Sequence, residues 1–177
     1  VRGEVNVGPG LARNRCLEAA SASWIHFQDA DDLMDPQFLE RMAALREEAD
    51  VVIASGTSDV GLDYGHPDQR PVPDPLRYAL EHLIGGTFGL YRRATLVGIG
   101  GFAPDLARLG HEDPDLHVRL ALAGARFVTT SERLIHHRRQ PHSFSLVGWE
   151  RCMRGAVVAG RRWMRDVPTS YRSNVTR

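Results

Sequence analysis

Three aspartates within four residues, Asp29, Asp31 and Asp32, form the densest group of potentially reactive side chains in the sequence. They follow the apolar run 24–27, which predicts a short buried central strand, and precede a turn at 33–36. Neighbouring carboxylates are costly unless a cation neutralises them, and a hard divalent cation completes its oxygen shell with substrate phosphates. The same pattern also fits an acidic strand-to-helix turn whose carboxylates cap the next helix, and the two interpretations carry equal weight.

A second acidic pair, Glu112 and Asp113, stands at the expected start of a helix that ends near Gly124. Asp113 followed by Pro114 suits a helix N-terminus on capping grounds alone, so a structural role can explain the pair. The same position also directs a carboxylate out of the helix start into a cleft, where it can take a proton from a hydroxyl group.

Arg13 and Asn14 lie in the first turn of a helix expected over 11–22, directly after a glycine-proline-glycine turn. Taken alone, their position favours two solvated side chains. Gly86 belongs to a glycine-rich bend over 85–91 that runs into a strand. Such a bend permits a ligand to approach the backbone closely, and it equally fits a simple tight turn.

His136 and His137 end a strand expected over 133–137. Because neighbouring strand residues point to opposite faces of a sheet, at most one of the two faces any given site. A neutral imidazole there could complete a metal shell, whereas a structural or solvated histidine fits at least equally well.

The composition suits one domain with a proper core, since 42% of the 177 residues are hydrophobic. The net charge of zero gives no general case for nucleic-acid binding, although eleven arginines face three acids from Arg126 onward. The two cysteines, Cys16 and Cys152, form neither a metal signature nor a disulfide framework, which favours a reducing, cytoplasmic compartment. We expect no membrane-spanning segment and no signal peptide.

The remaining elements follow from apolar patterning and turn residues. A helix is expected to begin at Pro36, capped by Asp35, and to bury an apolar stripe that runs to Ala49. Further strands are expected at 51–54 and 126–130, a helix over 76–84, and a long loop over 56–75.

The last expected helix, over 146–164, has apolar residues on one side and arginines on the other. Such a helix can lie on an anionic membrane surface, but more often its apolar stripe packs on its own domain or on a partner. We expect a domain over residues 1–145, followed by this basic amphipathic helix and a tail over 146–177.

Three stretches together resemble family 2 glycosyltransferases of the GT-A fold. They are GPGLARNRCLEAASASWIHFQDADDLMDPQFLERM, GGTFGLYRRATLVGIGGF and HEDPDLHVRLALAGARF. Each motif is weak by itself, whereas three motifs in the family's order and at similar separations are specific. The resemblance covers about residues 1–145 and implies an α/β fold, a GT-A-like (Rossmann-like) mixed sheet flanked by helices.

The resemblance also implies roles for particular residues. On the donor side, Asp29 and Asp31 match the D-x-D positions that contact the ribose and the metal-diphosphate, and the nucleotide-sugar site further includes Arg13, Asn14 and Gly86. On the acceptor side, Glu112 and Asp113 match the catalytic motif, with Asp113 the better candidate for the base. The metal, Mn²⁺ or Mg²⁺, is assigned to Asp31 with His136 or His137, and Asp32 is a second-sphere or acceptor-side carboxylate.

The implied enzyme is an inverting, metal-dependent glycosyltransferase that moves a hexosyl group from a nucleoside-diphosphate sugar to a glycan, lipid or other hydroxyl acceptor. It would work in the cytoplasm, with peripheral membrane contact through the basic helix as one option and no nucleic-acid partner. The family pattern has about two further strand–helix units before Val1, which grip the nucleotide base. We therefore expect a sheet that is incomplete on its N-terminal side, in a chain that is a fragment or that relies on another segment.

Three other functions compete with this interpretation. The first is a non-catalytic, truncated GT-A-like binding or scaffold module. The second is a metal hydrolase that uses Asp29, Asp31 and one of the two histidines. The third is a nucleotidyltransferase, which can share the nucleotide-binding architecture.

Overall fold

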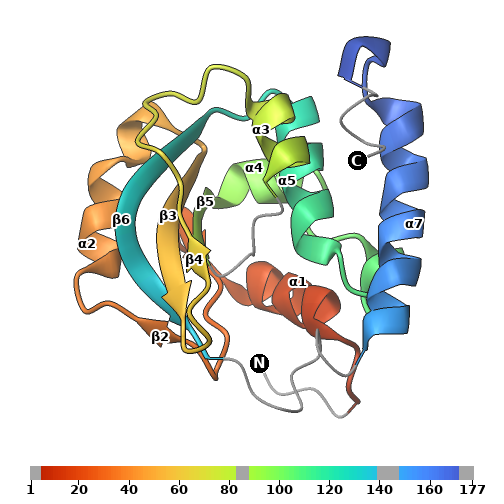
Figure 1. The fold of residues 1–177 in the computed structure, drawn as a ribbon, viewed down its shortest axis with the longest axis horizontal. Coiled ribbons are helices and arrows are strands. Elements are labelled where there is room, and N and C mark those ends of the chain that lie inside the picture. Colours follow the sequence, from red (N-terminus) through yellow and green to blue (C-terminus); the bar gives the residue numbers. More distant parts are fainter. Residues whose placement is uncertain (1–4, 83–87, 139–147, 172–177) are drawn as a thin grey trace.

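The computed structural model describes residues 5–82, 88–138 and 148–171, and a curved sheet runs through its centre (Figure 1). The strands are β1 (Trp24–His26), β2 (Leu33–Met34), β3 (Val51–Ser58), β4 (Asp63–Tyr64), β5 (Gly89–Arg92) and β6 (Phe127–His137). The helices are α1 (Pro9–Ala19), α2 (Phe38–Ala44), α3 (Pro75–Glu81), α4 (Arg93–Gly98), α5 (Glu112–Leu122) and α7 (Trp149–Asp166). Single 3-10 turns lie at Arg46–Glu48, Pro104–Leu106 and Thr169–Tyr171.

Within the described residues the strands form one mixed sheet. Their order is β1-β5-β3-β6-β2, and β4 pairs with the C-terminal end of β3. The central pair, β3 and β6, is parallel, whereas the pairs made by β1, β2, β4 and β5 are antiparallel. The predicted α/β fold with a mixed sheet and flanking helices is confirmed.

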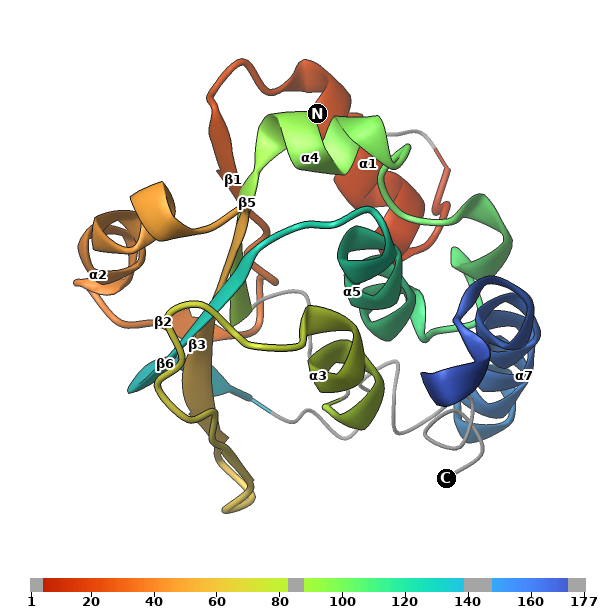
Figure 2. The same cartoon turned by 90° about the horizontal axis from the view of Figure 1, so that it is seen from above.

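Helices cover both faces of the sheet, so its central strands are buried. In Figure 2, α2 lies on one side of the sheet, α3, α4 and α5 lie on the other, and α7 is farthest from it. The run Val51–Ala54 of β3 is fully buried between these layers. Phe38 and Met42, one turn apart on α2, are also fully buried, as the predicted apolar stripe requires.

The strands on either side of the aspartate motif differ from the prediction. The expected buried central strand is β1, which lies at an edge of the described sheet, pairs with β5, and buries only Ile25. Leu33 and Met34, expected in a turn, form β2 by pairing with β6. Both side chains are exposed, so no apolar pattern marks this strand, and the pairing partner decides it.

The predicted strands at 126–130 and 133–137 are one continuous strand, β6. Its pairing with β3 shifts register on both sides of Ser55, which is the signature of a bulge. The exposed polar residues between the two predicted strands accommodate this irregularity and explain the false break. The predicted loop over 56–75 also starts too early, because β3 continues to Ser58 and β4 follows it.

Two predicted helix starts are wrong in detail. The helix expected from Pro36 begins at Phe38, and Asp35 Oδ1 accepts from the Gln37 amide at 2.8 Å without capping the helix. The N-cap of α5 is His111, whose φ of 64° is left-handed, and Asp113 lies inside the first turn. Its carboxylate is therefore not needed as a cap and is available for another contact. The helices expected over 11–22, 76–84 and 146–164 are present with shifted ends.

Helix α7 is fastened to the rest of the chain by buried charges. Asp115 of α5 has no exposed surface, and it accepts from Arg162 at 2.7 Å, Arg119 at 2.8 Å and the Trp163 indole at 3.3 Å. A buried carboxylate is tolerated only with such partners, so this cluster fixes where α7 lies. One face of the helix thus packs on its own domain. Among the described helices, none has the length and apolarity needed to cross a bilayer.

Candidate active site

Arg13 of α1 joins the two acidic motifs. Its Nη2 donates to both carboxylate oxygens of Asp29, at 2.8 and 3.1 Å, and its Nη1 donates to Asp113 Oδ1 at 2.9 Å. The same Nη1 lies 3.7 Å from Glu112 Oε1. The arginine is only 9% exposed, so the expectation of a solvated side chain is wrong. Carboxylates from two motifs that are distant in sequence, Asp29 in one and Glu112 and Asp113 in the other, share one buried guanidinium.

Local structure explains how these groups meet. Proline starts α1, and Arg13 lies on its buried face together with Gly10 and Leu17, at helical spacing. A Cβ atom at Gly10 would lie in van der Waals contact with Glu112, so α1 and α5 pack closely at this point. Asp29 follows β1, and Glu112 lies in the first turn of α5. The site therefore forms where a strand end meets the starts of two helices.

Burial and neighbouring charges shift the pKa values of Glu112 and Arg13 in the cluster. Burial, together with the adjacent charge of Asp113, raises the pKa of Glu112 to about 7. Burial alone would lower the pKa of Arg13, but the charges of Asp113 and Asp29 outweigh it, and the pKa is raised. Arg13 is thus always charged, whereas Glu112 can hold its proton near neutral pH. The Asp113 side chain is more exposed than that of Glu112, 19% against 9%, which makes it more accessible to a substrate.

His117 links the first turn of α5 to Tyr91 of β5. Its Nδ1 lies 2.8 Å from the Asp113 carbonyl oxygen, and its Nε2 lies 3.0 Å from the Tyr91 hydroxyl. Because a carbonyl only accepts, Nδ1 carries the proton and Nε2 accepts from Tyr91. Burial lowers the pKa of His117 to about 4, which keeps the ring neutral. Sequence reasoning missed this residue, although its position four residues after Asp113 places both on one helix face.

We expect His117 to make stability depend on pH. Its folded pKa of about 4 lies below the ordinary 6.5, so its contribution is complete above pH 6.5 and is lost as the pH falls towards 4. Between about pH 7.5 and about pH 5 the loss amounts to about 2 kcal/mol of unfolding free energy. Urea unfolding of the wild type and His117→Gln at both pH values measures it. Glu112 titrates with the opposite sign in both proteins and cancels in the difference; an unchanged pH dependence in the variant contradicts the assignment.

The other two aspartates of the motif have different surroundings. Asp31 is exposed, and its backbone oxygen accepts from the Arg138 guanidinium. Asp32 is buried, and its Oδ1 accepts from the Arg138 amide at 3.1 Å. Its Oδ2 has no hydrogen-bond partner and lies 3.7 Å from His137 Nδ1. Burial raises the pKa of Asp32 despite the opposing effect of His137.

The predicted metal ligands Asp31, His136 and His137 are only partly brought together. His136 Nδ1 forms a 3.0 Å hydrogen bond with Thr57 Oγ1, and His137 faces Asp32 instead of Asp31. In the part of the chain that the structure describes, no three side chains of the ligand type are grouped as a preformed site. Carboxylates, an imidazole and the unpartnered Asp32 oxygen nevertheless fit a hard divalent cation whose shell is completed by phosphate oxygens.

Asn14, another predicted donor-site residue, is not part of the acidic cluster. The Asn14 amide donates to the Phe102 carbonyl and accepts from the Phe102 amide, both at 2.8 Å, and so ties α1 to the loop after α4. Gly101 has a φ of 68°, and a side chain there would collide with Asn14. Gly86 lies outside the described residues.

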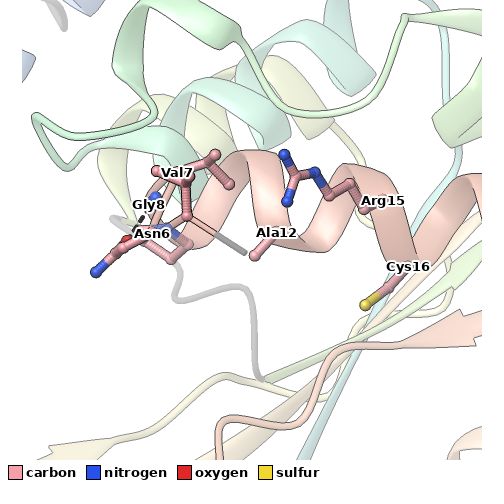
Figure 3. Close-up of a pocket in the computed structure, with 8 residues that line it drawn as sticks. Asn6, Val7, Gly8, Ala12, Arg15 and Cys16 are labelled. Carbon is pink, nitrogen blue, oxygen red and sulfur yellow. Dashed lines mark hydrogen bonds between the residues drawn. The ribbon is translucent and has the colours of Figure 1, made fainter. Parts of the chain in front are cut away.

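A cavity of about 490 Å³ lies beside a face of α1 other than the one that carries Arg13 (Figure 3). Its lining includes Ala12, Arg15 and Cys16 of the helix and the preceding residues from Val5 to Pro9. Asn6 Oδ1 accepts from the Gly8 amide at 3.0 Å and shapes its rim. The acidic cluster does not line this cavity, so the hollow and the reactive groups lie on different faces of one helix.

Comparison with solved structures defines the class of fold. The chain is similar to TarS 1–349 of S. aureus in complex with UDP-GlcNAc (TM-score 0.74, 20% identity, 99% of this chain and 53% of that chain). It is also similar to the mannosyltransferase PcManGT of Pyrobaculum calidifontis in complex with GDP-Man and Mn²⁺ (TM-score 0.67, 19% identity, 99% and 50%). The fold is therefore that of a GT-A glycosyltransferase, and the chain spans about half the length of these structures.

The sequence comparison defines the family. Residues 1–96 match the model described as Glycosyl transferase family 2. The match spans more than half of the chain, and the chain belongs to this family. No curated protein matched the sequence.

Proposed function

We propose that this chain forms part of an inverting glycosyltransferase that moves a hexosyl group from a nucleoside-diphosphate sugar to a hydroxyl acceptor. The carrying observation is the Arg13 bridge, which holds Asp29 of one acidic motif and Asp113 of the other on one guanidinium. Two carboxylate groups with different tasks are thereby placed side by side. Similar structures in complex with UDP-GlcNAc, or with GDP-Man and Mn²⁺, support a nucleotide-sugar donor.

The donor would bind at the end of β1. Asp29 and Asp31 are proposed to receive the ribose and the diphosphate, with Arg13, Asn14 and Gly86 completing the nucleotide-sugar site. Asp31, with His136 or His137, would hold Mn²⁺ or Mg²⁺, and the bound cation would offset the charge that grows on the leaving diphosphate. The unpartnered oxygen of Asp32 beside His137 supports a cationic group at this place.

The acceptor would bind at the start of α5. Asp113 is proposed to take the proton of the attacking hydroxyl, because it is the more exposed acid of the pair. Glu112, with its pKa raised to about 7 by burial, can stay protonated and donate a hydrogen bond to the acceptor. Attack from the face opposite the diphosphate inverts the anomeric centre. Arg13, which contacts both Asp29 and Asp113, would hold the donor side and the acceptor side at a fixed distance from each other.

A second candidate is a non-catalytic GT-A-like binding or scaffold module. The specific observation in its favour is that the chain spans about half the length of the similar solved structures. In that case the acidic cluster would bind a nucleotide sugar or a partner without turnover.

Donor binding and product release test the proposal. We expect UDP- or GDP-sugars to raise the melting temperature when Mn²⁺ is present, and nucleoside diphosphate to be released on incubation. Asp31→Asn should weaken the Mn²⁺-dependent binding on the order of tenfold, as expected for a lost contact of about 1.4 kcal/mol. Glu47→Gln, which alters an exposed acid in the 3-10 turn after α2, is the matched control. Binding without release favours the module. Absence of any donor binding contradicts the glycosyltransferase and leaves only a module that binds a partner.

The remaining assignments are part of the same proposal. Residues 1–145 would form the glycosyltransferase domain, and 146–177 an attached basic helix and tail. The acceptor would be a glycan, a lipid or another hydroxyl compound, and the neutral net charge does not favour nucleic acid. The free cysteines, Cys16 and Cys152, suit the reducing cytoplasm.

A further inference from the structure

Helix α7 has two different faces. Ala159 and Trp163 are buried against the domain, whereas Met153, Val157 and Met164 are 45%, 52% and 38% exposed. These three residues are four and seven positions apart, so they lie on one side of the helix. They form an apolar ridge about 16 Å long, at about 1.5 Å per residue. Apolar residues at this spacing on an outer face leave an amphipathic helix only half covered.

A row of arginines borders this ridge. Arg154, Arg161 and Arg165 are seven and four positions apart and exposed, and on a helix they lie next to the apolar ridge. Arg154 pairs with Glu150 at 2.7 Å and Arg165 with Asp166 at 2.8 Å. Ion pairs on the surface contribute little, so both arginines can exchange these partners for stronger anions. The outer face therefore combines an apolar ridge with an arginine row.

The position of α7 makes this face accessible. In Figures 1 and 2 the helix lies at the outer margin of the molecule, beyond α5 and away from the sheet. Arg162, on the inner side, holds Asp105 and Asp115 and is not part of the row. These ion pairs hold the inner side of the helix against the domain and leave its outer face exposed.

We propose that the outer face of α7 binds an anionic phospholipid bilayer. The apolar ridge would enter the boundary between headgroups and acyl chains, and the arginine row would contact lipid phosphates. Charge favours this occupant over a second copy of the chain, because ridge-to-ridge packing would bring two arginine rows together. The inference stands independently of the proposed catalytic activity, since it rests on a different surface.

Vesicle sedimentation of the intact protein tests the proposal. We expect binding to an equal mixture of phosphatidylcholine and phosphatidylglycerol, and much weaker binding to phosphatidylcholine alone or at high salt. Met153→Gln, Val157→Gln and Met164→Gln combined should lower the partition coefficient about tenfold or more. Arg161→Gln alone should lower it about fivefold, as expected for one arginine near an anionic surface.

Matched variants on other elements serve as controls. Leu39→Gln, Val60→Gln and Leu62→Gln combined alter side chains that are 53%, 57% and 44% exposed, close to those of the ridge. Arg46→Gln is the control for charge. Both should bind vesicles like the wild type. Equal loss of binding in the controls, equal binding to neutral vesicles, or a dimer that the ridge variant converts to a monomer without any lipid binding would overturn the proposal.

Discussion

Asp113→Asn is expected to lower the rate of sugar transfer by about 10²–10⁴-fold, the usual range for loss of a general base. An amide has nearly the same shape as the carboxylate, so α5 and the contact with Arg13 Nη1 can persist through the side-chain oxygen. The asparagine amide, however, cannot take a proton from the attacking hydroxyl. Donor affinity should change little, since the donor is assigned to Asp29 and Asp31. Product formation and donor binding by calorimetry measure the two effects separately.

Glu112→Gln is the matched comparison for this variant. Glu112 is adjacent and more buried, and its pKa of about 7 already lets it carry a proton near neutral pH. A neutral glutamine mimics the protonated state, so transfer should fall much less than in Asp113→Asn. The reverse ranking would assign the base to Glu112, and near-full turnover in both variants would remove the base from this helix.

Arg13→Ala is expected to destabilise the folded protein by about 3 kcal/mol, near the lower end for breaking a buried ion pair. It leaves Asp29, Glu112 and Asp113 close together with their shared cation removed. The lower end applies because the Asp29 side chain is 43% exposed and water screens part of its charge. Urea unfolding of both proteins near neutral pH measures the difference.

The pH dependence separates this electrostatic effect from lost packing. Without Arg13, the carboxylates keep protons more readily in the folded state than in the unfolded state. Folded pKa values raised in this way give stability at low pH that is lost as the pH rises through them. The deficit of Arg13→Ala should therefore be largest above the Glu112 pKa of about 7 and shrink towards pH 5. A deficit that does not vary with pH points to packing, and Arg13→Lys, which keeps the charge without the two-sided contact, should recover part of the stability.

The elements with strong local signals were predictable from sequence. The apolar stripe of α2 is a periodic pattern, the buried run of β3 is a continuous apolar stretch, and Gly124 ends α5 as expected. Elements without such a signal were missed. β2 exposes both of its residues and exists because β6 pairs with it, and the bulge opposite Ser55 joins two predicted strands into one.

For the candidate site, residue types were predictable and partnerships were not. Asp29, Glu112 and Asp113 stand out by composition, and Arg13 was assigned to the donor site through family resemblance alone. Its burial between the two acidic motifs depends on how α1 and α5 pack. The same holds for Asp115, whose partners Arg162 and Trp163 come from α7.

The sequence by itself determined the helices and strands that carry strong local patterns, the two acidic motifs and the family, because periodicity, turn residues and motif spacing are local properties of the chain. Only the tertiary structure decided that one guanidinium serves both motifs, that His117 secures the start of α5, and that half of the apolar face of α7 stays uncovered. Each of these depends on which side chains compete for the same buried volume. That competition involves residues far apart in the chain, and no local pattern encodes its outcome.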